Sequence, residues 1–245
     1  MSNPKRNTLR PLRHPAFRSL LTLLASGGLL AAQDSSVEFS DQPAFEQAFT
    51  ALKPSGEITG GINPMSTGEI VFDKGGKGSI SYILNPAGTQ PTGADAAISV
   101  TAAFRLVGSW DVGSFGLWAG VDSDKTNGWL ALANLLSPNE VRLRIFGRDA
   151  APGREKLPPP ILDQTVQTRS TLEKSAFVRL RLVIKPEKDG SAIRVSLLSD
   201  SSDEVLAEVQ TTEGGTSPAA AGLVGVRLAG ERVLWKNLSI SRRPE

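Results

Sequence analysis

The chain has 245 residues, of which 40% are hydrophobic, with 27 Lys and Arg against 25 Asp and Glu, one His and no Cys. This balance excludes a disordered chain and an extended membrane domain, and the length suits one all-β domain. The one histidine is His14. A body that starts after it therefore has no Ser-His-Asp or Cys-His catalysis and no Cys/His zinc site.

Residues 1–32 predict a secretory signal peptide. Five basic residues and no acidic one are followed by residues 19–32, a mostly apolar stretch that ends in small side chains. The stretch is shorter than the roughly 20 apolar residues that span a bilayer. We expect cleavage near Ala31 or Ala32, a secreted or periplasmic location and no stable membrane insertion of the mature chain. Residues 33–245 then carry 22 basic and 25 acidic groups, a net charge of −3.

Residues 40–53 predict one short amphipathic helix. Ser40 or Asp41 supplies a cap, Pro43 lies in the first turn, and the apolar positions follow the i, i+3, i+4, i+7 spacing of a helix. These positions are Phe45, Ala48, Phe49 and Leu52. We assign residues 33–64 to an N-terminal segment with this helix and residues 65–245 to a β-sandwich.

The rest of the chain predicts short strands separated by turns rich in Gly, Pro, Asn and Asp. The expected strands are 69–73, 78–84, 97–107, 114–121, 128–135, 140–147, 160–167, 176–185, 191–199, 203–211, 222–229 and 233–241. Several of them alternate; in residues 177–184, for example, apolar positions alternate with Arg179 and Arg181. The pattern predicts an all-β fold in which two antiparallel sheets each bury one face.

Two stretches resemble known β-sandwich proteins. The middle of the chain, Trp118-Ala119-Gly120-Val121-Asp122 followed by Gly128-Trp129-Leu130-Ala131 and Val141-Arg142-Leu143, is similar to concanavalin A-like lectin/glucanase domains. Residues 177–182, 193–195, 222–227 and 235–240 resemble the C-terminal half of laminin-G-like modules. The resemblance implies a jelly-roll sandwich with one concave sheet, in a superfamily of sugar-binding modules, adhesion domains and glycoside hydrolases.

A catalytic motif of that superfamily is missing from the sequence. Glycoside hydrolase family sixteen carries Glu-x-Asp-x-x-Glu on one strand, with its catalytic carboxylates about 5 Å apart on one face. The nearest match is Glu187-Lys188-Asp189, but the last position is Ala192 and the segment predicts a hairpin turn. We therefore favour a protein that is not an enzyme, while a carboxylate pair from separate strands stays open.

Residues 122–128 (DSDKTNG) raise the question of calcium, because clustered Asp and Asn oxygens are ligands that Ca²⁺ takes. The spacing is not that of an EF-hand loop. A hairpin turn capped by Asp and Asn side chains explains the same composition. We predict no cofactor, with calcium as an alternative that no specific motif supports.

Trp118 and Trp129 are candidate ligand-binding residues. Alternation places Trp118 with Ser114, Gly116 and Gly120, opposite a row of Phe115, Leu117, Ala119 and Val121. Trp129 lies with Ala131 and Ala133. A large ring among small residues suits stacking against a sugar, whereas the alternative is that both rings fill the core. For Trp235, which starts the last strand, we expect a core position.

Arg105, Arg142 and Arg144 complete the predicted site, with Arg179 and Arg181 beside them. If their strands were neighbours in one sheet, the face would suit hydroxyl, carboxylate or sulfate groups of a glycan. The alternative is a solvated face with cross-strand ion pairs. Nucleic acid is not an expected partner, because residues 33–245 are net acidic.

Together these features predict a secreted carbohydrate-binding or surface-interaction module of a bacterial envelope, without enzymatic activity, whose partner is a glycan or a cell-surface component. Two alternatives remain. One is a divergent glycoside hydrolase of the same fold, which needs two facing carboxylates. The other is a structural envelope or assembly protein without a small ligand, which predicts a core position for Trp118 and an exposed edge strand that pairs with another chain.

Overall fold

The structure is a computed structural model that describes residues 33–37, 42–55, 63–64, 69–73, 78–85, 96–111, 113–215, 221–230 and 232–244. The predicted signal peptide and the predicted helix cap at residues 40 and 41 lie outside these ranges. No helix within them is long and apolar enough to cross a membrane.

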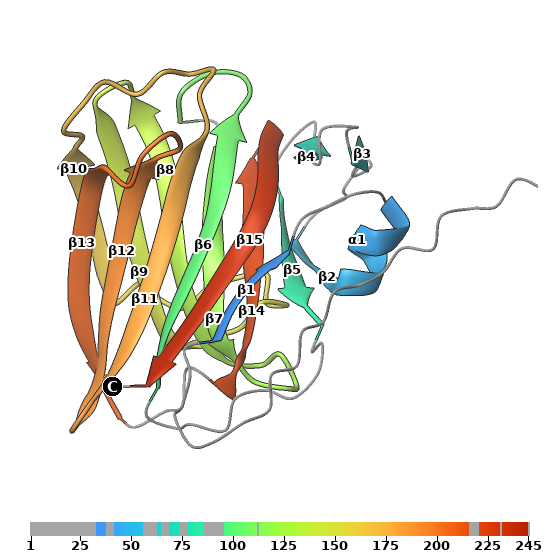
Figure 1. The fold of residues 1–245 in the computed structure, drawn as a ribbon, viewed down its shortest axis with the longest axis vertical. Coiled ribbons are helices and arrows are strands. Elements are labelled where there is room, and N and C mark those ends of the chain that lie inside the picture. The colour runs from blue at the N-terminus through green and yellow to red at the C-terminus, as the bar shows by residue number, and fades with distance from the viewer. Residues whose placement is uncertain are drawn as a thin grey trace, which may run out of the picture. The chain divides into compact units, whose positions relative to one another are not determined.

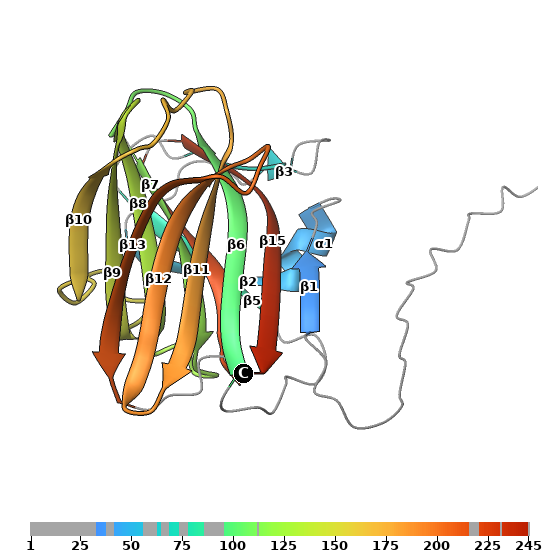
Figure 2. The same ribbon diagram turned by 60° about the vertical axis from the view of Figure 1, so that its left-hand side comes forward.

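The strands of the described residues form two antiparallel sheets that lie as two layers (Figures 1 and 2). Sheet A has the order β13-β12-β11-β6-β15-β4-β3, with β1 also paired to β15. Its strands are β1 (Gln33–Val37), β3 (Asn63–Pro64), β4 (Glu69–Asp73), β6 (Ala96–Leu106), β11 (Val178–Glu187), β12 (Gly190–Ser199), β13 (Val205–Gly214) and β15 (Arg232–Pro244).

Sheet B has the order β10-β9-β8-β7-β14-β5-β2. Its strands are β2 (Phe49–Ser55), β5 (Ser79–Leu84), β7 (Gly113–Val121), β8 (Gly128–Ser137), β9 (Glu140–Ala150), β10 (Leu162–Gln167) and β14 (Leu223–Gly230). The all-β sandwich with two antiparallel sheets is therefore confirmed, and each of the twelve predicted strands is present with small shifts of its ends.

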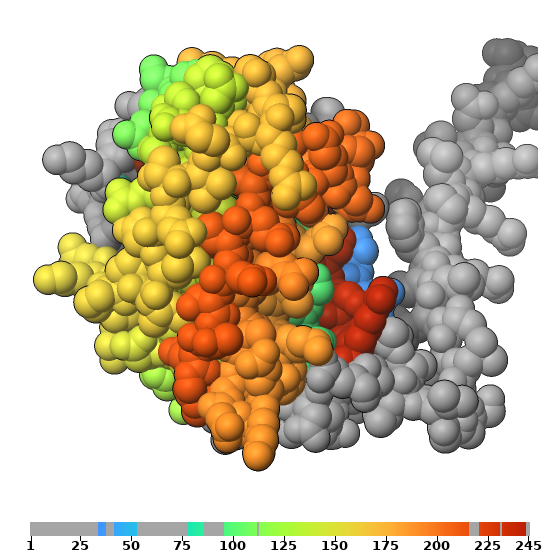
Figure 3. Space-filling model, turned by 90° about the vertical axis from the view of Figure 1, so that its left-hand side faces the viewer, coloured from blue at the N-terminus to red at the C-terminus, as the bar shows by residue number. Residues whose placement is uncertain are grey.

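The main core lies between the two sheets and follows the alternation of the strands. In β11, Val178, Leu180, Leu182 and Ile184 are buried in this core, while Arg179 and Arg181 lie on the outer face. At one edge, β10 and β13 contact each other across the two sheets, so the core is closed there (Figure 3). Leu162 and Val166 of β10 pack against the core from this edge.

The N-terminal segment differs from the prediction. Helix α1 (Gln42–Ala48) ends earlier than expected, because the chain from Phe49 pairs with β5 as strand β2. Pairing with β5 supplies hydrogen-bond partners to the backbone N–H and C=O groups of this segment. Residues 33–64, expected to precede the sandwich, thus supply β1 and β3 to sheet A and β2 to sheet B.

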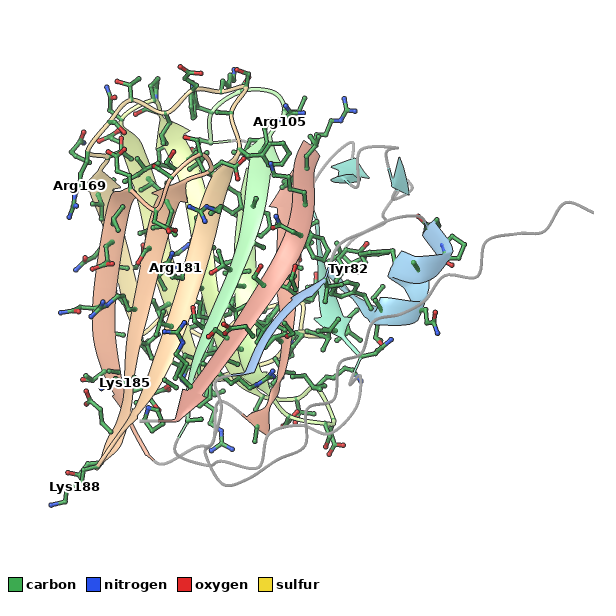
Figure 4. The ribbon with its side chains drawn as sticks, in the orientation of Figure 1. Tyr82, Arg105, Arg169, Arg181, Lys185 and Lys188 are labelled. Carbon is green, nitrogen blue, oxygen red and sulfur yellow. The ribbon has the colours of Figure 1, made fainter. Side chains whose placement is uncertain are left out.

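An aromatic cluster fixes this segment to the core. The ring of Phe45 lies 5.0 Å from that of Phe49, 5.2 Å from that of Tyr82 and 5.8 Å from that of Trp235, measured between centroids. Tyr82 lies on β5 beside α1 in Figure 4. The core position predicted for Trp235 is confirmed, since its side chain is fully buried.

One predicted face is wrong at the end of β7. Val121 was expected beside Phe115 and Leu117, but it belongs to a second buried cluster on the outer face of sheet B, together with Trp118. The cause is Gly120, whose φ of 61° interrupts the extended backbone, and the pairing of β14 with β7 shifts register at this place. A left-handed residue of this kind reverses the alternation that follows it.

Candidate functional site

Three rows of side chains run across the outer face of sheet B, because the strand registers align these residues. The tryptophan row contains Phe146, Leu130, Trp118, Gly225 and Ile83. The arginine row contains Asp163, Arg144, Leu132, Gly116, Arg227 and Ser81. The serine row contains Thr165, Arg142, Asn134, Ser114, Ala229 and Ser79.

The tryptophan row is sealed, which corrects the expectation of an open platform at Trp118. The Trp118 side chain is 0% exposed, and Leu157 of the segment between β9 and β10 packs against its cluster. Its Nε1–H donates to Ser81 Oγ at 3.1 Å, and Ser81 Oγ donates to the carbonyl oxygen of Pro152, in the same segment, at 3.2 Å. Gly225, the partner of Trp118 on β14, leaves space that the Ile83 side chain and the Tyr82 carbonyl group of β5 occupy. A buried ring offers no face to a sugar.

Trp129 lies on the opposite side of sheet B, in the main core. It is 2% exposed, and its Nε1–H donates to the Glu213 carboxylate at the end of β13. The backbone N–H of Arg148 donates to the same carboxylate at 3.1 Å. Glu213 thus ties β13 to the two neighbouring strands of sheet B, and Trp129 is a structural residue in place of the expected ligand contact.

The predicted arginines do not share one face. Arg105, Arg179 and Arg181 lie on the strands of sheet A, where Figure 4 labels Arg105 and Arg181, whereas Arg142 and Arg144 lie on β9 of sheet B. The two sets are therefore on opposite sides of the sandwich. The sequence could not reveal this division, because sheet membership depends on which distant strands pair.

The arginines of sheet A serve mainly to hold loops. Arg179 and Arg181 donate to the Asp203 carboxylate at 3.1 and 3.2 Å, and Arg179 also donates to the carbonyl oxygen of Ser199 at 3.0 Å. The guanidinium group of Arg105 lies over the Phe177 ring, 4.8 Å from its centroid. For this side the alternative of cross-strand and loop ion pairs is the one that the structure supports.

On sheet B, Arg142 is also paired. Its guanidinium group donates twice to the Asp163 carboxylate, at 2.7 and 2.6 Å. These hydrogen bonds hold the pKa of Asp163 below its ordinary value, against the opposing effect of burial, and raise the pKa of Arg142. The side chains are 47% and 32% exposed, so this pair lies at the solvent edge of the face.

Arg144 has no carboxylate bound to it. Its Nη2 donates to Asn134 Oδ1 at 2.5 Å, while its Nε is buried and has no hydrogen-bond partner. Burial lowers the pKa of Arg144, and the charge of Arg142 lowers it further. This guanidinium group therefore has spare donor capacity on the outer face of sheet B.

Arg227 is the functional candidate that the site prediction missed. It is 5% exposed, and its hydrogen bonds go to hydroxyl groups: Nη2 donates to Ser79 Oγ at 2.7 Å, and Nη1 contacts Ser81 Oγ at 3.5 Å. Burial lowers the pKa of Arg227 to about 10, with a further contribution from the charge of Arg144, so the group is still a cation at neutral pH. The sequence contains a signal for the burial of Arg227: residues 222–229 are otherwise apolar or glycine, a composition typical of a buried strand.

Leu132 and Gly116 lie between the two arginines in the arginine row, and the Leu132 side chain is buried beside Gly116. Arg144 bonds to Asn134 on β8 and Arg227 to Ser79 on β5, both in the serine row. Asn134 is held in place, because its Nδ2 donates to the carbonyl oxygen of Gly113 at 3.1 Å. The two guanidinium groups are thus fixed by strands that lie three places apart in sheet B.

Residues 122–128, for which calcium binding was the alternative to a capped hairpin turn, form hydrogen bonds with one another. The Asp122 carboxylate accepts hydrogen bonds from the Thr126 backbone N–H at 2.7 Å, from Thr126 Oγ1 at 2.8 Å and from Asn127 Nδ2 at 2.9 Å. Burial acts to raise the pKa of Asp122, but these bonds outweigh it and hold the pKa below its ordinary value. Asx capping of a hairpin turn thus accounts for the composition, and the described residues contain no group of three or more acidic or histidine side chains suited to a metal.

A pocket of about 450 Å³ lies next to this loop. It is lined by Val121, Asp122, Ser123, Lys125, Ala221, Gly222 and Leu223. Because Val121 on β7 pairs with Leu223 on β14 and both belong to the cluster around Trp118, the pocket lies beside the tryptophan row, on the side away from the arginine row.

Comparisons with known proteins identify the fold and no more. No family model and no curated protein sequence matches the chain. Among solved structures, an endo-1,3-β-glucanase from Streptomyces sioyaensis matches 90% of this chain and 100% of its own with a TM-score of 0.55 and 11% identity. Arcelin-5, a lectin-like defense protein from Phaseolus vulgaris, matches 87% of this chain and 99% of its own with a TM-score of 0.51 and 9% identity. The chain therefore has the concanavalin A-like jelly-roll fold.

Proposed function

We propose that the protein is a non-enzymatic carbohydrate-binding module, exported from the cell, whose site is the arginine and serine rows on the outer face of sheet B. The observation that carries this proposal is the pair of cations there without a hydrogen-bonded carboxylate: the Nε of Arg144 has no partner, and the guanidinium group of Arg227 bonds to the hydroxyl groups of Ser79 and Ser81. A saccharide presents many oxygen acceptors, and planar guanidinium groups bind pairs of oxygens.

The fold supports this proposal without deciding it. The solved structures that share the fold include a glucanase and a lectin-like protein, so both binding and hydrolysis occur on it. Because a fold hosts several functions, the site must choose between them.

The carboxylates of the described face favour binding over hydrolysis. Asp163 accepts two hydrogen bonds from Arg142, and Glu140 accepts one from Gln167 at 2.7 Å. Asp163 on β10 pairs with Arg144 on β9. Arg144 lies four residues from Glu140 along β9, so the positions of Asp163 and Glu140 are about 13 Å apart along the strands. Glycoside hydrolases place their carboxyl groups about 5 to 9.5 Å apart.

An assembly protein is a second candidate, because the buried Trp118 is what that alternative predicts. It also requires an edge strand that is free to pair. Strand β10 is the edge of sheet B and is largely exposed, but it carries Asp163 and a row of polar residues, which disfavour edge pairing. A monomer measured by light scattering at high concentration would contradict this candidate.

The test of the proposed function is a glycan array with the purified chain and three variants. Arg142→Ala and Arg144→Gln change the face of sheet B, while Arg181→Gln changes the outer face of sheet A as a matched control. We expect binding that the sheet B variants weaken and the control does not. Binding of no glycan, or equal loss in all variants, would contradict the proposal.

A further inference from the structure

We infer that the pocket next to residues 122–128 is a second binding site, which takes a small carboxylic acid with an apolar body, and that Lys125 binds the carboxylate. This site goes beyond the proposed function and is separate from the one on the arginine and serine rows. None of the described residues that line the pocket belongs to either row.

The pocket has the size and depth of a small-molecule site. Its volume of about 450 Å³ lies within the range of roughly 300 to 1,000 Å³ that is usual for such sites. Among its lining residues, Ser123 is exposed and Lys125 is half-buried, whereas Val121 is 0% exposed and belongs to the buried cluster around Trp118. The pocket therefore extends from the solvent to an apolar cluster.

The inner walls of the pocket are apolar. Val121, Ala221 and Leu223 supply apolar side chains. At Gly222 the wall is main chain, because a Cβ atom there would come within 2.3 Å of the Gly120 backbone. Walls of this kind favour a ligand with an apolar body, whose surface is removed from water on binding.

The two charged residues that line the pocket differ in their pairing. The Asp122 carboxylate accepts hydrogen bonds from Thr126 and Asn127, so the loop itself compensates this charge. In the part of the chain that the structure describes, no carboxylate forms an ion pair with Lys125. An ammonium group without an acidic partner suits a ligand carboxylate, because hydrogen bonds between charged groups are among the strongest.

The backbone at Lys125 indicates that its side chain has a use. Its φ is 59°, in the left-handed region that Gly and Asn adopt at lower cost than Lys. The turn is fixed in this form, since the Lys125 N–H donates to the carbonyl oxygen of Asp122 at 3.0 Å. A lysine at a position that favours glycine or asparagine is explained if its ammonium group binds a ligand, and strained backbone is frequent at binding sites.

The experiment uses three probes that share one apolar body and differ in charge: phenylacetate, phenylacetamide and phenethylamine. Acetate is a fourth probe that lacks this body. Each is titrated into the purified chain while the backbone amide signals of residues 121–125 and 221–223 are followed by NMR. Lys125→Asn removes the ammonium group and keeps a residue that tolerates the left-handed backbone, and Ala221→Phe fills the pocket. Lys174→Asn, at an exposed position before β11, is the control.

We expect phenylacetate to shift these signals and to bind about 10- to 100-fold more tightly than the amide or the amine, as expected for a hydrogen bond between charged groups. Acetate should bind more weakly than phenylacetate. Lys125→Asn should remove the preference for the acid, Ala221→Phe should abolish binding, and the control should change neither. No binding of phenylacetate, equal affinities for the acid and the amide, or an unchanged preference in Lys125→Asn would overturn the inference.

Glycan binding measured on the same variants separates this inference from the proposed function. Lys125→Asn should retain it, and its loss there would overturn the inference, because the pocket would then belong to the glycan site. Absence of glycan binding by the unmodified chain, with phenylacetate bound in the pocket, would contradict the proposed function and support the inference.

Discussion

The tryptophan row and the arginine row lie side by side on the same face of sheet B, but they differ in how their polar groups are paired. In the tryptophan row, the Trp118 N–H, the Ser81 hydroxyl and the Pro152 carbonyl form a closed chain of hydrogen bonds under the segment that follows β9. In the arginine row, Arg144 and Arg227 are desolvated but bind no carboxylate. The difference separates a row whose polar groups are paired within the chain from a row whose two cations have no hydrogen-bonded carboxylate.

The arginines of sheet A make the contrast sharper. Arg179 and Arg181 share the Asp203 carboxylate, so their charge is compensated within the chain. Arginine content alone therefore says little about binding. The informative feature is a buried arginine without an acid, and in the described residues Arg227 shows it most clearly.

The largest effect is expected from Trp118→Ala, which breaks the sealed row. Removing a fully buried indole leaves a cavity, and we expect the free energy of unfolding to fall by about 3–5 kcal/mol. Urea denaturation measures this loss. Trp118→Phe is the matched control, since it keeps a ring and loses only the hydrogen bond to Ser81. A loss below about 1 kcal/mol for the alanine variant would show that the row is not a packed cluster.

A substitution in the arginine row is not expected to lower the free energy of unfolding. Arg227→Met removes a buried charge that has no hydrogen-bonded carboxylate, and we expect stability to be unchanged or to rise by up to about 1–4 kcal/mol, as for buried ion pairs that are replaced by apolar side chains. The control is Arg179→Met on sheet A, which should lower stability because Arg179 is paired. A marked loss of stability in Arg227→Met would mean that this arginine is a structural residue.

Ser81→Ala tests the link between the two rows. Ser81 accepts from Trp118 and donates to Pro152, so its removal leaves a buried N–H and a carbonyl without their partner. We expect a loss of about 1–3 kcal/mol in urea denaturation. The rate of backbone amide hydrogen exchange in residues 151–161 should rise as well. Ser114→Ala, in the serine row, is the control and should change neither quantity by a comparable amount.

The smallest effect is expected at the paired edge of the site. The pKa of Asp163 is lowered in the folded state, so its contribution to stability is present above the ordinary Asp pKa of 3.8 and is lost as the pH falls through the lowered value. Asp163→Asn should therefore cost up to about 1 kcal/mol at pH 7 and almost nothing at pH 2.5, measured as a difference in melting temperature. Asp149→Asn on β9 is the control. An equal difference at both pH values would contradict the ion pair as its cause.

The sequence predicted the fold well because strand alternation is a local signal. Regular strands such as β11 keep the period of two, so their buried and exposed faces are predicted correctly. Val121 is assigned to the wrong face because the left-handed backbone at Gly120 leaves no mark on the hydrophobic pattern. Strand β2 is missed because its pairing with β5 is a long-range effect.

The site was harder to predict than the fold. Which arginines share a face depends on sheet membership, and whether Trp118 is exposed depends on the segment that covers it. Both depend on contacts between residues that are far apart in the sequence. Arg227 was within reach of the sequence, because a single charge inside a run of apolar and glycine residues is unusual for a buried strand.

The most direct test of the account is a crystal structure of the chain with the oligosaccharide selected by the array. The account predicts that the oligosaccharide lies on the outer face of sheet B, with an oxygen within hydrogen-bond distance of Arg144 or Arg227. An oligosaccharide seated in the pocket beside Asp122 and Lys125, or on sheet A, without contact to either arginine, would contradict it.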